Sequence, residues 1–219
     1  MDRRLLMAGL LIAGWTALGG GMAVAAENLV KNPGFELSQP VNVDRDMKEF
    51  VSRGVDLLKG TAVPMPAGWS LNVSDGWSKE GKDLFRYVAG EAGKEVHSGT
   101  HAIRIGSGVH AVVYVESMAT VVPEAGANKN VLLLNKPNKF SFWAKGKGQV
   151  MIYAYTYLAE GENYSARTVT PAMFNTTDDW QKYDGAIEFT NPKVVSSRIV
   201  VCISQGDVTI DDVAWYGQD

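Results

Sequence analysis

The chain has 219 residues, with 21 basic and 24 acidic side chains and a formal net charge of −3 at pH 7. The charges are mixed along the sequence without a basic block, which argues against nucleic acid or an anionic membrane surface as a partner. Cys202 is the only cysteine, so no disulfide within the chain can stabilise it. Its neighbours in RIVVCIS indicate a small buried residue on a strand.

The first 26 residues have the pattern of a secretory signal peptide. Residues 2–4 form a charged start, an apolar run extends from Leu5 to Ala17, and Ala23-Val24-Ala25 places small residues where a signal peptidase reads them. We expect cleavage after Ala25 or Ala26, a mature domain of residues 27–219, and a secreted or periplasmic location. No later segment has the roughly 20 consecutive apolar residues of a membrane-spanning helix, so no membrane span is expected.

The mature chain has the pattern of an all-β protein. Short runs rich in Val, Ile, Phe, Tyr and Thr alternate with Gly, Asn, Asp and Pro, which is typical of a β-sandwich. The predicted strands cover residues 100–106, 110–117, 138–146, 149–158, 180–189, 196–204 and 207–217. The residues AKGKGQ between two of them predict a tight hairpin.

One segment near residues 43–59 has a different period. Asp44 suits an N-cap, and a helical spacing follows in Met47, Phe50, Val51, Val55 and Leu58. Gly54 weakens this helix by about 1 kcal/mol relative to Ala. We therefore expect a short helical insertion laid across one edge of the sandwich, with a packing role favoured over a functional lid.

The two ends of the mature chain carry carboxylates that suit a shared cation. Glu36 follows the turn at residues 32–34, and Asp211 and Asp212 are adjacent within the last strand. Because Ca²⁺ takes carboxylate and carbonyl oxygens, Glu36 and one aspartate would hold an ion that pins the first segment to the last strand. The alternative is that these side chains are solvated charges at strand ends.

Five motifs in order resemble a known family across nearly all of the mature chain. They are NLVKNPGFE (28–36), PAGW (66–69), HSGTHAIRI (97–105), FSFWAKGKG (140–148), and DDWQKY (178–183) leading to VTIDDVAW (208–215). This pattern resembles the carbohydrate-binding modules of the galactose-binding-like β-sandwich group, particularly families four, nine and twenty-two. The segment Met47–Leu58 departs from the family pattern.

The resemblance implies a jelly-roll of two antiparallel sheets and a structural calcium. Carried over to this chain, the calcium ligands are Glu36 and Asp211, with backbone carbonyls from Gly34 and from the turn Ser98–His101. Asp212 takes the place of Asp211 if the register differs by one residue. Trp69 and Trp180 match core positions of the family, which implies structural roles for both.

A row of tyrosines on one predicted strand is the strongest candidate for a ligand surface. Tyr153, Tyr155 and Tyr157 alternate with smaller residues, so they share the face opposite to the core. Flat aromatic rings bind the apolar faces of sugar rings, and a strand spaces them about 7 Å apart. The remaining candidates for the binding surface and its polar rim are Trp143, Trp77, Arg86, Glu116, Gln149 and Asn163. In the alternative reading, the tyrosine row shields the sheet beneath loops or the insertion.

We therefore expect a non-catalytic module that binds a polysaccharide or glycan, with a glycoside hydrolase as a possible partner. No pair of acids is marked by a motif, and the spacing of His97, His101 and His110 is not that of a metal-dependent hydrolase. Two alternatives stay open. One is a protein-interaction module of the same fold, and the other is a small glycan-active enzyme with an unmarked acid pair.

Overall fold

Two packed β-sheets form most of the computed structural model, which describes residues 27–42, 62–73, 85–106, 111–115, 118–124, 126, 130–159 and 172–217. All regular elements within these ranges are strands, so the predicted all-β sandwich is confirmed. The proposed signal peptide (1–26), the predicted helical insertion (43–59) and Trp77 lie outside the described residues.

The larger sheet has seven strands and carries the tyrosine row. Its main path runs β11 (Ala172–Thr176), β10 (Gly148–Leu158), β13 (Val194–Gly206), β6 (Ala111–Val115) and β3 (Trp69–Val73), and β7 (Ala119–Val122) also pairs with β13. The short β8 (Leu132–Leu133) pairs in parallel with β7, whereas the other pairs are antiparallel.

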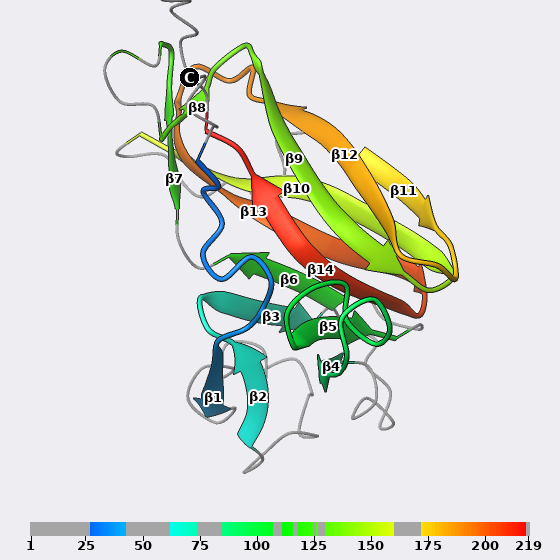
Figure 1. Cartoon of the computed structure of the whole chain (residues 1–219). Coiled ribbons are helices and arrows are strands. Elements are labelled where there is room, and N and C mark those ends of the chain that lie inside the picture. Colours follow the sequence, from blue (N-terminus) through cyan, green and yellow to red (C-terminus); the bar gives the residue numbers. More distant parts are fainter. Residues whose placement is uncertain are drawn as a thin grey trace, which may run out of the picture.

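The second sheet has five antiparallel strands and lies across the first one in Figure 1, with β9, β12 and β14 in front of β10 and β13. Its order is β12 (Gln181–Glu188), β9 (Pro137–Lys145), β14 (Val208–Trp215), β5 (His101–Ile105) and β4 (Phe85–Ala89). A separate two-stranded sheet consists of β1 (Ser38–Asn42) and β2 (Ala62–Pro66).

The core lies between the inner faces of the two sheets, as the alternation of apolar residues predicts. From β10 it takes Val150, Ile152 and Ala154, and from β9 it takes Phe140, Phe142 and Ala144, all of them buried. Fully burying a side chain of this size contributes about 1.5–3 kcal/mol, so these two strands supply a large share of the packing energy. Trp69 is also buried in this core, as the family resemblance implies.

The predicted hairpin between β9 and β10 is wrong, because the two strands belong to different sheets. Gly146 and Lys147 form a tight corner that passes the chain from one sheet to the other. A Cβ atom on Gly146 would lie 2.2 Å from the carbonyl oxygen of Asp207, and one on Gly148 would lie 2.4 Å from that of Gln205. The two glycines are therefore needed because the corner packs directly against the backbone between β13 and β14.

The first described residues run antiparallel to the last strand. The backbone N–H of Leu29 donates to the carbonyl of Trp215 (2.8 Å), and that of Gly217 donates to Glu27 (3.1 Å). The side chain of Asn28 accepts a hydrogen bond from the backbone of Trp215 (3.0 Å). This pairing brings the GFE motif beside the two aspartates of β14.

Candidate functional site

The tyrosine row lies on the outer face of the seven-stranded sheet, but its members differ in exposure. Tyr153 is only 7% exposed and packs with Val200 and Cys202 of β13, which are 0% and 2% exposed. Tyr155 and Tyr157 are partly exposed. The rings of Tyr153 and Tyr155 meet edge to face with centroids 5.7 Å apart, so the buried ring supports the exposed one from the side.

A cation lies beside the exposed end of the row. Arg198 pairs with Tyr155 across β10 and β13, and its guanidinium carbon lies 5.3 Å from the ring centroid of Tyr157. At this distance the cation is attracted to the electron-rich ring. The face thus has an apolar end around Tyr153 and Val200 and a polar end around Tyr155, Tyr157 and Arg198.

Trp143 does not join this face. It lies on the outer side of β9 in the other sheet, where its ring stacks on His97 with centroids 3.7 Å apart and planes 15° apart. The sequence left this question open because the answer depends on which strands pair. Arg86 is also on the five-stranded sheet, Gln149 contacts Asn175 across β10 and β11 (3.4 Å), and Glu116 and Asn163 lie outside the described residues.

The residues predicted to bind calcium come together where the GFE motif meets β14. Asp211 is fully buried. Its Oδ2 atom accepts hydrogen bonds from the backbone N–H groups of His97 (2.9 Å) and Ser98 (3.1 Å), and its Oδ1 atom accepts one from Asp212 (2.7 Å). Burial, with the charge of Asp212, raises the pKa of Asp211 to about 7 despite these donors.

Asp212 and Glu36 are each anchored by a different part of the loop before β5. The hydroxyl of Ser98 donates to Oδ1 of Asp212 (2.9 Å). The backbone N–H of Thr100 donates to Oε1 of Glu36 (2.9 Å), and His101 Nδ1 lies 3.6 Å from Oε2 of Glu36. Burial works to raise the pKa of Glu36, but hydrogen bonds from Thr100 and His101 outweigh it, and the net pKa lies below its usual value.

Gly34 forms the floor of this carboxylate cluster. A Cβ atom built there would lie 3.2 Å from Oδ1 of Asp212 and 3.8 Å from Oδ1 of Asp211, with Cγ of Glu36 at 3.9 Å. The carboxylates of Asp211 and Asp212 and the aliphatic part of Glu36 thus lie around a residue without a side chain. Phe35 and Asp212 both have a positive φ, and such backbone strain is often found at ligand sites.

The chemistry of the cluster fits a hard cation. A buried carboxylate next to a second acid is costly, and Ca²⁺ binds oxygen ligands of this type. Within the described ranges, no three His, Cys, Asp or Glu side chains form a group that could hold a metal ion. The carboxylates of Asp211 and Glu36 accept from backbone N–H groups, and that of Asp212 contacts the side chains of Ser98 and His97.

The sequence did not indicate how the loop at residues 90–100 is fixed. The carbonyl oxygen of Lys94 accepts hydrogen bonds from Trp180 Nε1 and from Lys145 Nζ, both at 3.0 Å. The ring of Trp180 also lies edge-on to His97 at 5.7 Å. Trp180 is thus structural, as the resemblance implies, but it anchors a surface loop and is only partly buried.

No protein-family model matches the chain, and no curated protein matches it. Solved structures of carbohydrate-binding modules do match most of it. The family 61 module TmCBM61, solved with β-1,4-galactotriose, is 15% identical, with a TM-score of 0.45 over 88% of this chain and 100% of that one. The CBM22-1 xylan-binding domain of Paenibacillus barcinonensis Xyn10C is 11% identical, with a TM-score of 0.44 over 88% and 96%.

A family 4 module is similar at the same level, with 13% identity and a TM-score of 0.44 over 86% of this chain and 99% of that one. The chain is thus similar in structure to modules of families 4, 22 and 61 at low sequence identity. This similarity concerns the fold. The described residues contain no helix that would cross a lipid bilayer.

Proposed function

We propose that this chain is an exported, non-catalytic module that binds a polysaccharide or glycan at the outer face of its seven-stranded sheet. The observation that carries the proposal is the pair Tyr155 and Tyr157, which face outward, are partly exposed, and have the guanidinium of Arg198 beside them. Aromatic rings stack on the C–H faces of sugars, and a guanidinium donates to their hydroxyls. Tyr153 is too deeply buried to lie against a sugar and supports Tyr155.

The composition of this sheet favours binding over hydrolysis. Its seven strands contain no Asp or Glu residue. Glycoside hydrolysis uses two carboxyl groups that face each other about 5–9.5 Å apart, and the strands beneath the tyrosines do not supply them. A glycoside hydrolase that acts on the same polymer is the partner that this proposal expects.

The proposal includes a structural calcium at Glu36, Asp211 and Asp212. When bound, the ion would supply positive charge to the buried Asp211 and join the first segment to the last strand. Gly34 puts no side chain between these acids, and the hydroxyl of Ser98 holds Asp212 in place. The ion would have no part in sugar binding, because these residues belong to the other sheet and its flanking loops.

A protein-docking role is the second candidate, and one observation favours it. Met173 on β11 is 62% exposed and pairs with Met151 on β10, next to the buried cluster of Tyr153. Exposed methionines are common on surfaces that bind other proteins. On this reading, the apolar end of the face rather than its polar end contacts the ligand.

Affinity electrophoresis against a panel of soluble neutral polysaccharides tests the proposal. Tyr155→Ala and Tyr157→Ala should each weaken binding about tenfold, whereas Tyr155→Phe, which keeps the ring, should retain it. Met173→Ala, at the apolar end, should leave sugar binding unchanged. Retardation that does not respond to Tyr155→Ala, or no retardation by any polymer, would reject this site.

A further inference from the structure

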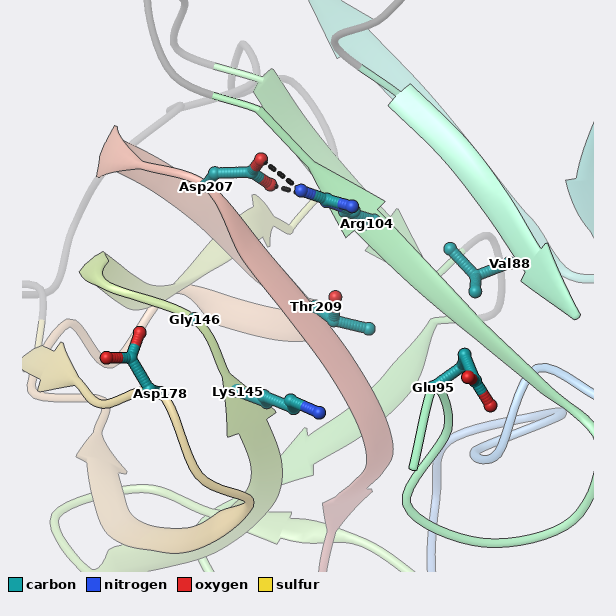
Figure 2. Close-up of a pocket in the computed structure, with 8 residues that line it drawn as sticks. All are labelled: Val88, Glu95, Arg104, Lys145, Gly146, Asp178, Asp207 and Thr209. Carbon is teal, nitrogen blue, oxygen red and sulfur yellow. Dashed lines mark hydrogen bonds and ion pairs between the residues drawn. The ribbon is translucent and has the colours of Figure 1, made fainter. Parts of the chain in front are cut away.

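The outer face of the five-stranded sheet holds a pocket that is separate from the tyrosine face. Its volume is about 290 Å³, close to the lower end of small-molecule sites. Figure 2 shows the residues that line it, which come from neighbouring strands and from the loops around them. The two faces point away from each other across the core. The pocket is therefore not part of the tyrosine site.

The floor of the pocket consists of outward-facing residues on four adjacent strands. Val88, Arg104, Thr209 and Lys145 come from β4, β5, β14 and β9, in the order in which these strands pair. Arg104 and Thr209 are direct partners across β5 and β14, and Thr209 and Lys145 are direct partners across β14 and β9. Side chains at such positions point to the same face and are held by the sheet.

Loops supply the walls. Glu95 belongs to the loop that is fixed through the carbonyl of Lys94, and its Oε2 atom accepts a hydrogen bond from the backbone of Glu91 (3.1 Å). Asp207 lies in the turn between β13 and β14, and Asp178 lies between β11 and β12. In Figure 2 these three carboxylates surround the strands that form the floor. The pocket is thus built from rigid strands and anchored turns.

The charges of the pocket are largely balanced. Arg104 donates from Nε to Oδ1 of Asp207 (2.7 Å) and also forms an ion pair with Oδ2. Asp178 forms an ion pair with Lys147 (2.8 Å). Lys145 uses one of its three N–H donors on the carbonyl of Lys94. A free anion would meet three carboxylates here, and a free cation would meet Arg104 and Lys145.

A neutral ligand with many hydroxyl groups suits this lining best. A hydroxyl both donates and accepts, so it can donate to Glu95 or Asp178 and accept from Lys145. Thr209 adds a hydroxyl of its own, and the side chain of Val88 offers a small apolar surface for C–H groups. We propose that the pocket is a second binding site, which takes a single sugar unit or a similar neutral polyol independently of the tyrosine face.

Chemical-shift mapping tests this site with the whole protein labelled with ¹⁵N. The probes are glucose, galactose and xylose, with sodium phosphate and methylammonium chloride as charged controls. At least one sugar should shift the backbone amides of Thr209, Arg104 and Gly146, and the two charged probes should not. Thr209→Val has nearly the same shape and should weaken the sugar's apparent Kd about threefold to tenfold, as the loss of one hydrogen bond predicts.

Thr190→Val is the matched control, because Thr190 is exposed and lies outside the pocket. Tyr155→Ala should leave the pocket shifts unchanged, so failure here and failure of the tyrosine site are distinguishable. The proposal is overturned if no sugar shifts these amides, if only the charged probes shift them, or if Thr209→Val binds as tightly as the unchanged protein. It is also overturned if Tyr155→Ala removes the pocket shifts.

Discussion

The Nδ1 atom of His97 lies 2.6 Å from Oδ2 of Asp212, a residue 115 positions further along the chain. The same imidazole ring stacks on Trp143 at 3.7 Å. One side chain thus joins the loop before β5 to two strands of the five-stranded sheet. Its polar contact holds an acid of the proposed calcium site, and its ring covers a tryptophan.

His97→Ala should lower the free energy of unfolding by about 1–2 kcal/mol, because both the stacking contact and a partly exposed hydrogen bond are lost. His97→Phe keeps a ring against Trp143, whereas His97→Asn keeps a polar group for Asp212. Each of these variants should therefore lose only part of the stability that His97→Ala loses. Urea denaturation measures the free energy of unfolding of each variant. Glu188→Ala on the exposed side of β12 should change stability by less than about 0.5 kcal/mol. An equally small change for His97→Ala would contradict the assigned role.

Calcium should raise the thermal stability of the protein. With the affinity typical of extracellular modules, about 5 mM calcium should add about 1–2 kcal/mol, and a chelator should reverse this. Differential scanning calorimetry measures the change in Tm. Glu36→Gln should remove most of the response, whereas Asp184→Asn on β12 should keep it. If the Tm is the same in chelator and in calcium, the proposed calcium site is rejected.

The chelated protein should lose stability as the pH rises from about 4 to about 7. Burial raises the pKa of Asp211 to about 7 in the folded state, so folding favours its protonated form in this range. The folded state then binds more protons than the unfolded state, and the unfolding free energy falls with pH, by up to about 4 kcal/mol. Below about pH 4 and above about pH 7, Asp211 does not contribute to the change of unfolding free energy with pH.

The slope of unfolding free energy against pH isolates this effect. Asp211→Asn cannot accept all three backbone hydrogen bonds, so it should be less stable at every pH, but its slope should be flatter than that of the unchanged protein. Calcium should also flatten the slope, because it favours the ionised carboxylate. A steeper slope in the variant would refute the assignment.

Gly185 should not tolerate a side chain. It pairs with Phe140 across β12 and β9, and a Cβ atom there would lie 2.4 Å from Cζ of the phenylalanine ring. Because that ring is fixed in the core, Gly185→Ala should cost about 1–3 kcal/mol through overpacking. Thermal unfolding gives the change in Tm. Ala186→Ser, at the next and exposed position, should have little effect, and a stable Gly185→Ala would show that Phe140 can move.

The sequence predicted most of the sandwich because its strands alternate regularly. All seven predicted strands are present, and Val150, Ile152 and Ala154 face the core as expected. The strands β4 and β11, of five residues each, were missed. The hairpin error arose because glycines in a short connection suit a turn within one sheet and a corner between two sheets equally.

The candidate sites were predictable in part. The chemistry of the acids predicted that Glu36 and one of the two aspartates lie together, and the family resemblance selected Asp211 and added Gly34. The structure places Gly34 beside both acids. The position of Trp143 depends on which strands pair. Local sequence patterns do not contain that information. The pocket on the five-stranded sheet escaped notice because Arg104, Thr209 and Lys145 are ordinary strand residues whose juxtaposition arises only from the register.

The antiparallel pairing of residues 27–30 with the end of the chain has a mechanical consequence. Glu27 meets Gly217 and Leu29 meets Trp215, so both ends of the domain leave it at the same side. A pulling force applied between these ends would break the backbone hydrogen bonds one after another, rather than stretch all of them at the same time. Such a domain should yield to tension at low force, and its first step should separate Glu27 from Gly217, well before the force reaches Asp211.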